Sequence, residues 1–176
     1  MRGCLVLVVG PSGAGKDTLI RLAREALADD PRYVFPRRLV TRPPSADEDN
    51  DEIDEAAFAE GCATGRFTLH WRAHGLGYAI PKEAGRLAEA GHVVVCNVSR
   101  RVVAQARAAG SRVSVVEITA PPEILMQRLA ARGRAEDGDL AARLARAVPV
   151  AADLRILNVG PPGTGAERLL SHLRAC

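Results

Sequence analysis

The sequence has few aromatic residues: Phe, Trp and Tyr together make up 3% of its 176 residues. A core with so few rings must be built from Val, Leu, Ile and Ala, and this composition suits a parallel sheet covered by helices. The scarcity also argues against a protein that binds single-stranded nucleic acid, which needs aromatic side chains on which the bases stack. The net charge of +3 is too small to predict a nucleic-acid partner.

Other absences narrow the class of protein further. No apolar run is long enough to cross a membrane, and the apolar stretch at residues 1–10 is too short for a complete signal peptide. The four cysteines are far apart and form no C-x-x-C pair, which argues against a disulfide scaffold and against a zinc site. Cys4 and Cys96 lie in apolar runs and are expected in the core. We therefore expect a cytoplasmic protein with no membrane partner.

The length fits one domain, and the order of the segments predicts its class. Short apolar runs rich in β-branched residues alternate with segments of helical spacing. The predicted strands are residues 4–9, 33–40, 67–73, 92–97, 113–119 and 154–158, with 75–80 continuing or pairing with the third. The predicted helices are residues 16–28, 81–90, 102–109, 121–132, 139–147 and 165–173. The acidic stretch 43–54 is predicted to be an exposed loop. This alternation indicates an α/β fold with a central parallel sheet.

Residues 10–18 contain the most specific motif. Residues 10–17 read G-P-S-G-A-G-K-D and match seven of the eight positions of the P-loop pattern G-x-x-x-x-G-K-[ST]. A predicted strand precedes the motif and a predicted helix begins inside it. The glycines let backbone N–H groups point at phosphate oxygens, and the lysine bridges the β- and γ-phosphates. We predict ATP binding by Gly10, Pro11, Ser12, Gly13, Ala14, Gly15, Lys16, Asp17 and Thr18.

The eighth position of the motif departs from the pattern. Asp17 stands where a hydroxyl normally binds Mg²⁺, and Thr18 follows it. A carboxylate is a competent Mg²⁺ ligand, directly or through water, so Asp17 is predicted to help hold the metal. The alternative is that Asp17 only places a favourable negative charge at a helix N-terminus.

Beyond the P-loop, three segments follow in a recognisable order: T-R at 41–42, HWRAHGLGYAI at 70–80 and RLAARGR at 128–134. With them the chain resembles, over nearly its whole length, the guanylate kinase branch of the nucleoside monophosphate kinases. The resemblance implies a three-layer P-loop NTPase fold with an acceptor-binding insertion and a lid. It implies one P-loop kinase domain, residues 1–176, with a core at 1–32, 91–131 and 149–176, an acceptor-binding region at 33–80 and a lid at 132–140.

The same resemblance implies roles for individual residues. Those that match the grip on the acceptor's phosphate are Arg38, Arg42 and Tyr78. Those that match the lid and the helix after it are Arg132, Arg134 and Arg143, and Asn158 matches a residue near the adenine. Lys16, Arg132 and Arg143 are the implied catalytic residues. The alternative for the arginines is a solvated helix face shared with Glu136 and Asp137, and this alternative is favoured for Arg128 and Arg146.

The departures from guanylate kinases remove the groups that read guanine. His70 precedes Trp71 where those enzymes have a glutamate, and Ala79 and Ile80 follow Tyr78 where they have a threonine. A pocket without these polar groups loses most of its discrimination for guanine. Residues 96–100, C-N-V-S-R, replace the acidic D-x-D that follows the middle strand in that branch.

This combination, with Asp17, resembles the ribose 1,5-bisphosphate phosphokinases of phosphonate breakdown. It implies that ATP phosphorylates the 1-phosphate of ribose 1,5-bisphosphate and that the product is 5-phosphoribosyl 1-diphosphate. Beyond the phosphate grip, Trp71 is a further implied contact with this acceptor, although a core position is the favoured alternative for a tryptophan. Asn97, Ser99 and Arg100 are also expected to contact it, because they lie at the carboxyl end of a predicted parallel strand, where ligands bind in such sheets. A phosphate monoester has a second pKa near 6, so the acceptor is already anionic and needs no general base.

Two other functions remain open at the level of sequence. One is a guanylate or other nucleoside monophosphate kinase, and the other is a non-catalytic guanylate-kinase-like binding module. The intact Lys16 loop and the lid arginines argue against the second, because a binding module need not keep them. The expected ligands are ATP, Mg²⁺ and a small sugar bisphosphate, and the sequence leaves open whether the chain forms a homodimer.

Overall fold

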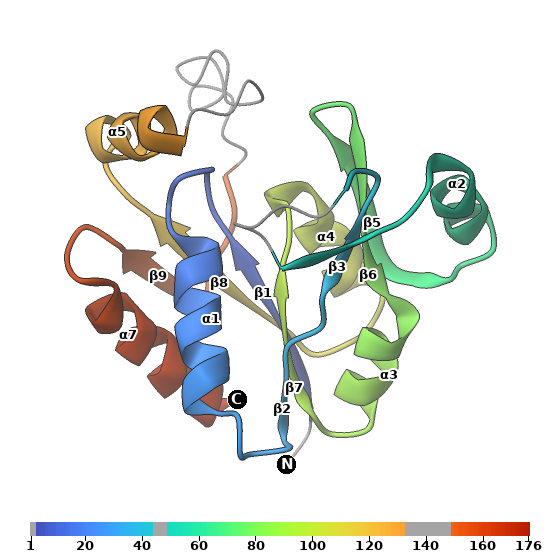
Figure 1. The fold of residues 1–176 in the computed structure, drawn as a ribbon. Helices are drawn as coiled ribbons and strands as arrows, with labels where there is room; N and C mark the ends of the chain where they lie inside the picture. Colours follow the sequence, from blue (N-terminus) through green and yellow to red (C-terminus); the bar gives the residue numbers. More distant parts are fainter. Residues whose placement is uncertain (1–2, 44–48, 133–148) are drawn as a thin grey trace.

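The computed structural model describes residues 3–43, 49–132 and 149–176. Its centre is a five-stranded sheet in which every neighbouring pair of strands is parallel (Figure 1). The strands, in spatial order, are β2 (Tyr33–Val34), β7 (Val93–Asn97), β1 (Cys4–Val9), β8 (Val113–Thr119) and β9 (Leu154–Leu157). Helices cover both faces, so the α/β fold with a central parallel sheet is confirmed.

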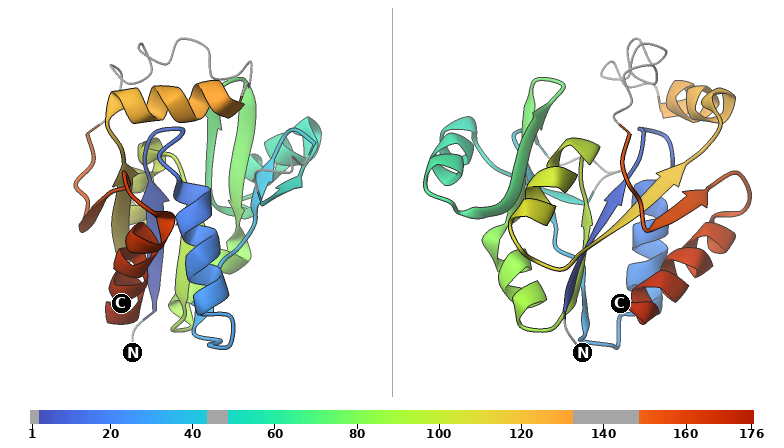
Figure 2. Two further views of the ribbon diagram at one scale, coloured as in Figure 1. Left: turned by 60° about the vertical axis from the view of Figure 1, so that its left-hand side comes forward. Right: turned by 180° about the vertical axis from the view of Figure 1, so that it is seen from behind.

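β1 explains how the sequence builds these layers. All six of its residues are buried, and successive side chains point to opposite faces of the sheet. Val6 and Val8 pack on the face covered by α1 (Lys16–Ala26) and α7 (Pro162–Ala175). Leu7 packs on the opposite face, which α3 (Lys82–Glu89) and α4 (Val103–Ala108) cover (Figure 2). A strand that is buried on both faces reads as an unbroken apolar run, and for that reason it was predictable.

A second sheet lies beside the first on the face that carries α3. Its spatial order is β4 (Asn50–Glu52), β3 (Arg38–Val40), β6 (Leu76–Pro81) and β5 (Phe67–Ala73). β5 and β6 form an antiparallel hairpin, so residues 75–80 pair with the preceding strand rather than extend it. One apolar cluster joins the two sheets: Leu69, Trp71 and Ile80 of the hairpin pack with Leu5 and Val94 of the parallel sheet.

Three elements in this region differ from the prediction. The single strand predicted at residues 33–40 is two strands, β2 and β3, that belong to different sheets. The loop predicted at 43–54 contains β4, which pairs in parallel with β3. The helix α2 (Glu55–Ala63) was not predicted, although Asp54 caps it by accepting a hydrogen bond from the Ala57 N–H at 2.7 Å.

Two further elements lie at the carboxyl end of the parallel strands. The short 3-10 helix η1 (Arg100–Val102) follows β7, and α5 (Pro122–Arg132) follows β8. In the left view of Figure 2, α5 crosses above the loop that joins β1 to α1. The helix predicted at residues 139–147 lies outside the described residues. No described helix has both the length and the apolar character that spanning a membrane requires. Cys4 and Cys96 are buried, as expected.

Candidate functional site

The loop between β1 and α1 has the backbone of a phosphate cradle. Gly10, Gly13 and Gly15 all have positive φ angles, of 146°, 82° and 91°, and such angles are open to glycine at little steric cost. Gly15 is also the N-cap residue of α1, so no side chain caps the N–H groups of the first turn. Lys16 Nζ donates to the carbonyl oxygens of Gly10 at 2.9 Å and Pro11 at 3.0 Å. The lysine therefore lies across the loop, where phosphate oxygens bind in such motifs.

Two side chains from other elements hold the carbonyl groups of this loop. Asn158, which follows β9 and is 6% exposed, donates through Nδ2 to the Ala14 carbonyl at 2.8 Å. Arg128 of α5 donates to the carbonyls of Gly13 at 3.2 Å and of Asn158 at 2.9 Å. A trans peptide points its C=O and the next N–H in opposite directions, so the Asn158 contact also fixes the direction of the Gly15 N–H.

Arg128 is a site residue that the sequence analysis placed elsewhere. It was assigned to a solvated helix face, but its guanidinium bonds to the P-loop and to the end of β9. The available signal was its position one helical turn before Arg132, a predicted lid residue. Asn158 was predicted near the adenine, and its adenine contact stays a prediction beside the structural contact just described.

Asp17 and Asn97 meet although they are 80 positions apart. Asn97 is the last residue of β7 and lies in register with Val8 of β1, next to the start of the P-loop. Its Nδ2 donates to Asp17 Oδ1 at 2.7 Å, while its Oδ1 is buried with no hydrogen-bond partner among the described residues. The carboxyl end of the parallel strands, where ligands bind in such sheets, thus carries a carboxylate held by an amide.

The predicted acceptor residues Arg38 and Tyr78 come together in the second sheet. The Arg38 guanidinium lies 5.7 Å from the centroid of the Tyr78 ring, which stacks on Trp71 at 5.4 Å with an interplanar angle of 5°. Arg38 Nε donates to Oδ1 of Asn50 at 3.0 Å. Asn50 is 4% exposed and was not singled out by the sequence analysis. Trp71 is 8% exposed and forms part of the core beneath Tyr78.

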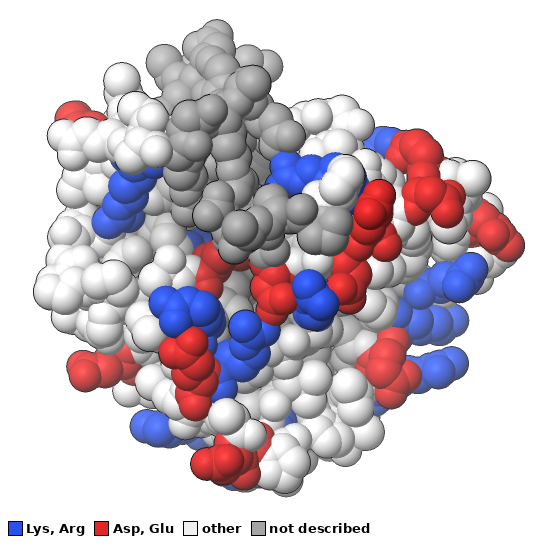
Figure 3. Space-filling view, in the orientation of Figure 1, with Lys and Arg blue, Asp and Glu red and all other residues white. Residues whose placement is uncertain are grey.

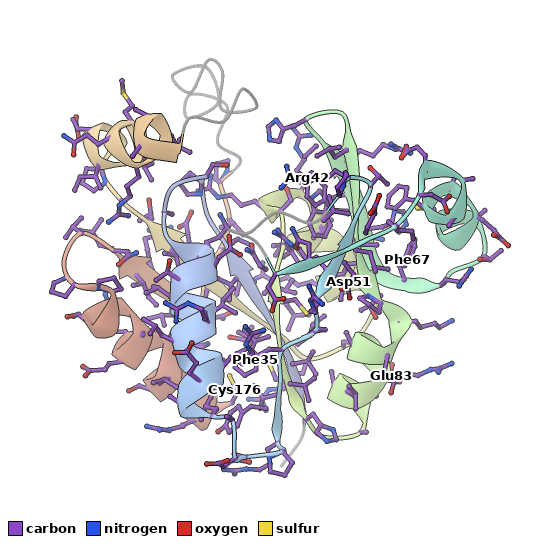
Figure 4. All side chains as sticks on the ribbon, viewed as in Figure 1. Phe35, Arg42, Asp51, Phe67, Glu83 and Cys176 are labelled. Atoms are coloured by element: carbon purple, nitrogen blue, oxygen red, sulfur yellow. The ribbon has the colours of Figure 1, made fainter. Side chains whose placement is uncertain are left out.

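The remaining predicted acceptor residues lie just beyond the ends of strands. Arg42 lies just beyond the end of β3, near the top of the second sheet in Figure 4. Ser99 caps η1 by accepting from the Arg101 N–H at 3.3 Å. Arg100 is paired with Glu117 of β8 at 3.2 Å, and both side chains are largely buried. The structure therefore places Ser99 and Arg100 at the end of β7, as predicted, and adds a partner for Arg100.

Charged side chains of both signs fill the space between α1 and the second sheet. Arg37 pairs with Asp49 and Asp51, each at 2.8 Å, and Arg24 of α1 also pairs with Asp49. The Arg24 guanidinium lowers the pKa of the Asp49 carboxyl, and Arg37 adds to the effect. Figure 3 shows acidic and basic side chains interleaved on this face. Positive and negative charges therefore alternate over the described part of this face.

Some predicted site residues cannot be placed. Arg134 and Arg143 lie outside the described residues, and for Arg132 the structure gives only its backbone, as the last residue of α5. Their roles in the lid and in catalysis stay predictions. The described part of the chain contains no group of three or more His, Cys, Asp and Glu side chains that could form a metal cage.

Comparison with known proteins identifies the family of the chain. An AAA domain family model matches residues 5–148, which include the P-loop and α5. The chain is 80% identical to the ribose 1,5-bisphosphate phosphokinase PhnN of Methylobacterium radiotolerans over 176 residues, which is 100% of both chains. It is 52% identical to the protein of the same name from Rhodopseudomonas palustris over 172 residues, covering 98% of this chain and 89% of that one.

A solved structure agrees with the fold. The crystal structure of guanylate kinase from Anaplasma phagocytophilum superposes with a TM-score of 0.70 at 21% identity, covering 99% of this chain and 86% of that chain. This likeness extends over both sheets and supports the guanylate-kinase-like arrangement expected from the sequence. The family itself rests on the full-length identity to the PhnN proteins, and the chain belongs to the ribose 1,5-bisphosphate phosphokinases, a P-loop family with a guanylate-kinase-like fold.

Proposed function

We propose that this chain transfers the γ-phosphoryl group of ATP to the 1-phosphate of ribose 1,5-bisphosphate, as a step of phosphonate catabolism. The products are ADP and 5-phosphoribosyl 1-diphosphate. The single observation that carries the proposal is the 80% identity, over the whole chain, to a protein named for this phosphokinase activity. The P-loop and the Arg38–Tyr78 pair supply the two halves of a site for such a transfer.

The reaction needs positioning and charge neutralisation more than proton transfer. An oxygen of the 1-phosphate attacks the γ-phosphorus, and the bond from that phosphorus to the β–γ bridging oxygen breaks. The attacking oxygen is already anionic near neutral pH because the second pKa of a phosphate monoester is near 6. Two anions must approach in line, and their repulsion would be offset by Lys16, by the lid arginines Arg132 and Arg134, and by Arg143 of the helix after the lid. Arg38 and Arg42 would hold the acceptor.

The residues present fit Mg²⁺ as the metal of the reaction. Mg²⁺ is usually held by one or two carboxylates together with substrate phosphates and water, rather than by an all-protein cage. Asp17 and Thr18, in the first turn of α1, offer a carboxylate and a hydroxyl beside the P-loop, and Asn97 holds the carboxylate in place. Mg²⁺ bound there with ATP supplies positive charge to the phosphate oxygens during transfer.

A direct assay tests the proposed activity against its alternatives. The purified protein is incubated with Mg-ATP and ribose 1,5-bisphosphate, GMP or no acceptor, and ADP and the second product are separated by chromatography. We expect equal amounts of ADP and 5-phosphoribosyl 1-diphosphate, and only in the reaction that contains ribose 1,5-bisphosphate as the acceptor. ADP formation only with GMP would assign the chain to the guanylate kinases instead. No ADP with any acceptor would favour a non-catalytic binding module.

A further inference from the structure

The contact between Asp17 and Asn97 joins the two positions that hold Mg²⁺ in P-loop proteins. In P-loop NTPases generally, a Ser or Thr at the end of the P-loop and an Asp on a neighbouring strand hold the metal. Here the P-loop position carries the carboxylate of Asp17. The strand position, at the end of β7 beside β1, carries the amide of Asn97. The carboxylate and the neutral side chain have exchanged places.

We infer that this exchange is reciprocal: Asp17 supplies the negative charge of the metal site from the helix, and Asn97 is a positioning residue that directs it. The hydrogen bond of 2.7 Å from Asn97 Nδ2 to Asp17 Oδ1 occupies one oxygen of the Asp17 carboxylate and restricts the rotamer of the Asp17 side chain. The second oxygen, Oδ2, is then presented in a fixed direction. In both arrangements the pair carries one negative charge, so the electrostatics toward Mg²⁺ and the phosphates are kept.

The chemistry of residue 97 explains why it is an amide. Two carboxylates that share a site cannot both ionise readily, because each disfavours the charge of the other. Once Asp17 occupies the P-loop position, an aspartate at position 97 would therefore compete with it. An asparagine has nearly the same shape and turns the contact into a hydrogen bond, because its Nδ2 donates to the carboxylate.

The other end of the amide points to the same conclusion. Because Nδ2 must face the carboxylate, Asn97 Oδ1 is directed away from Asp17, and it is buried without a hydrogen-bond partner among the described residues. Buried polar atoms normally find a partner, so an amide that leaves its oxygen unpaired is retained for its other end, and that end holds Asp17. The inference therefore assigns Asn97 to the metal site, whereas the sequence had predicted a role in acceptor binding.

ADP binding tests the inference without any acceptor, so the result is independent of whether the proposed function holds. Isothermal titration calorimetry gives the dissociation constant of ADP with Mg²⁺ and with EDTA, and the ratio of the two measures the metal's contribution. The variants are Asn97→Ala, Asp17→Thr and the double variant Asp17→Thr/Asn97→Asp, which recreates the common arrangement. Thermal unfolding without nucleotide verifies that each is folded, and the isosteric Asp17→Asn replaces Asp17→Thr if the latter is not.

The inference makes a different claim for each variant. Asn97→Ala and Asp17→Thr should each lower the magnesium contribution roughly tenfold or more, the range seen when residues that support metal ligands are removed. The double variant Asp17→Thr/Asn97→Asp should recover most of the magnesium contribution, although both positions are substituted. If the magnesium contribution of the double variant were no larger than that of Asp17→Thr, the proposed exchange would be wrong. An unchanged magnesium contribution in Asn97→Ala, with a raised KM for the sugar bisphosphate, would return Asn97 to the acceptor.

Discussion

At the scale of single residues, Asn50 shows how a neutral side chain can direct a charged one. Its Oδ1 accepts a hydrogen bond from Arg38 Nε at 3.0 Å, and the Arg38 guanidinium lies over the Tyr78 ring. Asn50 and Tyr78 together fix the orientation of this guanidinium, the group that the family resemblance implies in the grip on the acceptor's phosphate. A guanidinium held in one orientation suits bidentate binding of phosphate.

We therefore expect Asn50→Ala to weaken binding of the acceptor and not of ATP. A hydrogen bond to a charged group contributes about 1.5–3 kcal/mol, so the KM for ribose 1,5-bisphosphate should rise roughly tenfold or more. The KM for ATP should stay within about twofold, because Asn50 lies in β4 of the second sheet and contacts Arg38 rather than the P-loop lysine. Steady-state kinetics with one substrate varied and the other saturating give both values.

The double variant Arg38→Ala/Asn50→Ala shows whether Asn50 acts through Arg38. If it does, the second substitution adds little to the rise in KM that Arg38→Ala causes alone, because the group that Asn50 directs is already gone. Additive effects of the two substitutions would mean that Asn50 contributes to acceptor binding by another route.

The residues of the site were predictable where a motif fixes their spacing, and not where only the fold brings them together. The P-loop follows from a short pattern, and the family resemblance singled out Arg38, Arg42 and Tyr78, whose contacts with the acceptor stay predictions. The contacts made by Asn50, Asn97 and Arg128 do not follow from the sequence, because they form across a sheet or from a distant helix. A sequence without aligned relatives carries no sign of such contacts.

At the scale of elements, predictability followed burial. The strands β1, β5 and β8 were predicted with the bounds that the structure gives them. β4 reads N-D-E, residue types that are depleted in strands, and it exists because it pairs with β3. α2 has no apolar stripe, since only Phe58 and Gly61 are buried along its length. Elements without an apolar periodicity of their own, such as β4 and α2, cannot be found from the sequence pattern alone.

The P-loop itself supports a prediction at this scale, because its shape depends on Gly15. A Cβ atom there would lie 2.4 Å from Asn158 Nδ2, and the φ of +91° is a left-handed conformation. The left-handed backbone costs about 1–2 kcal/mol for other residues, and loss of the Asn158 hydrogen bond costs about 1 kcal/mol more. We expect Gly15→Ala to lower Tm by roughly 5–10 °C and to abolish measurable ADP binding by calorimetry.

Gly65→Ala separates the cost of the left-handed backbone from the cost of the close approach to Asn158. Gly65 also has a left-handed φ, of +67°, but a Cβ there would meet nothing within 4 Å. The variant Gly65→Ala therefore has the backbone strain without a steric clash. It should lower Tm less than Gly15→Ala does and leave ADP binding unchanged. Equal losses of Tm in the two variants would mean that the close approach of Asn158 contributes nothing to stability.

At the scale of the whole molecule, one apolar cluster ties the second sheet to the first. Trp71 and Leu69 of β5 pack in the same cluster as Leu7 of β1 and Val94 of β7. The second sheet therefore shares its core with the strand that leads into the P-loop. The single domain stays a prediction, and the shared cluster offers a way to test it, because neither sheet can lose its packing without exposing the other.

This shared core predicts that the molecule unfolds in one cooperative step. Trp71 is the sole tryptophan and lies in the second sheet, so its fluorescence reports there. Far-UV circular dichroism is dominated by helices, and it therefore reports mainly on α1, α5 and α7 of the core. In urea, the two signals should give the same midpoint. Two separated transitions would show that the second sheet unfolds as an independent unit.

A substitution in the first sheet makes the test stricter. Leu7 is fully buried in β1, and Leu7→Ala should cost about 2–5 kcal/mol through lost burial and the cavity left behind. With a urea dependence of about 1–3 kcal/mol per molar, both midpoints should fall together by roughly 1 M or more. The matched control is Leu157→Ala in β9, where the side chain is 56% exposed and the change should stay within about 0.5 kcal/mol. If Leu7→Ala moved the circular dichroism midpoint and left the Trp71 midpoint in place, the second sheet would not depend on the core that the structure shows it sharing.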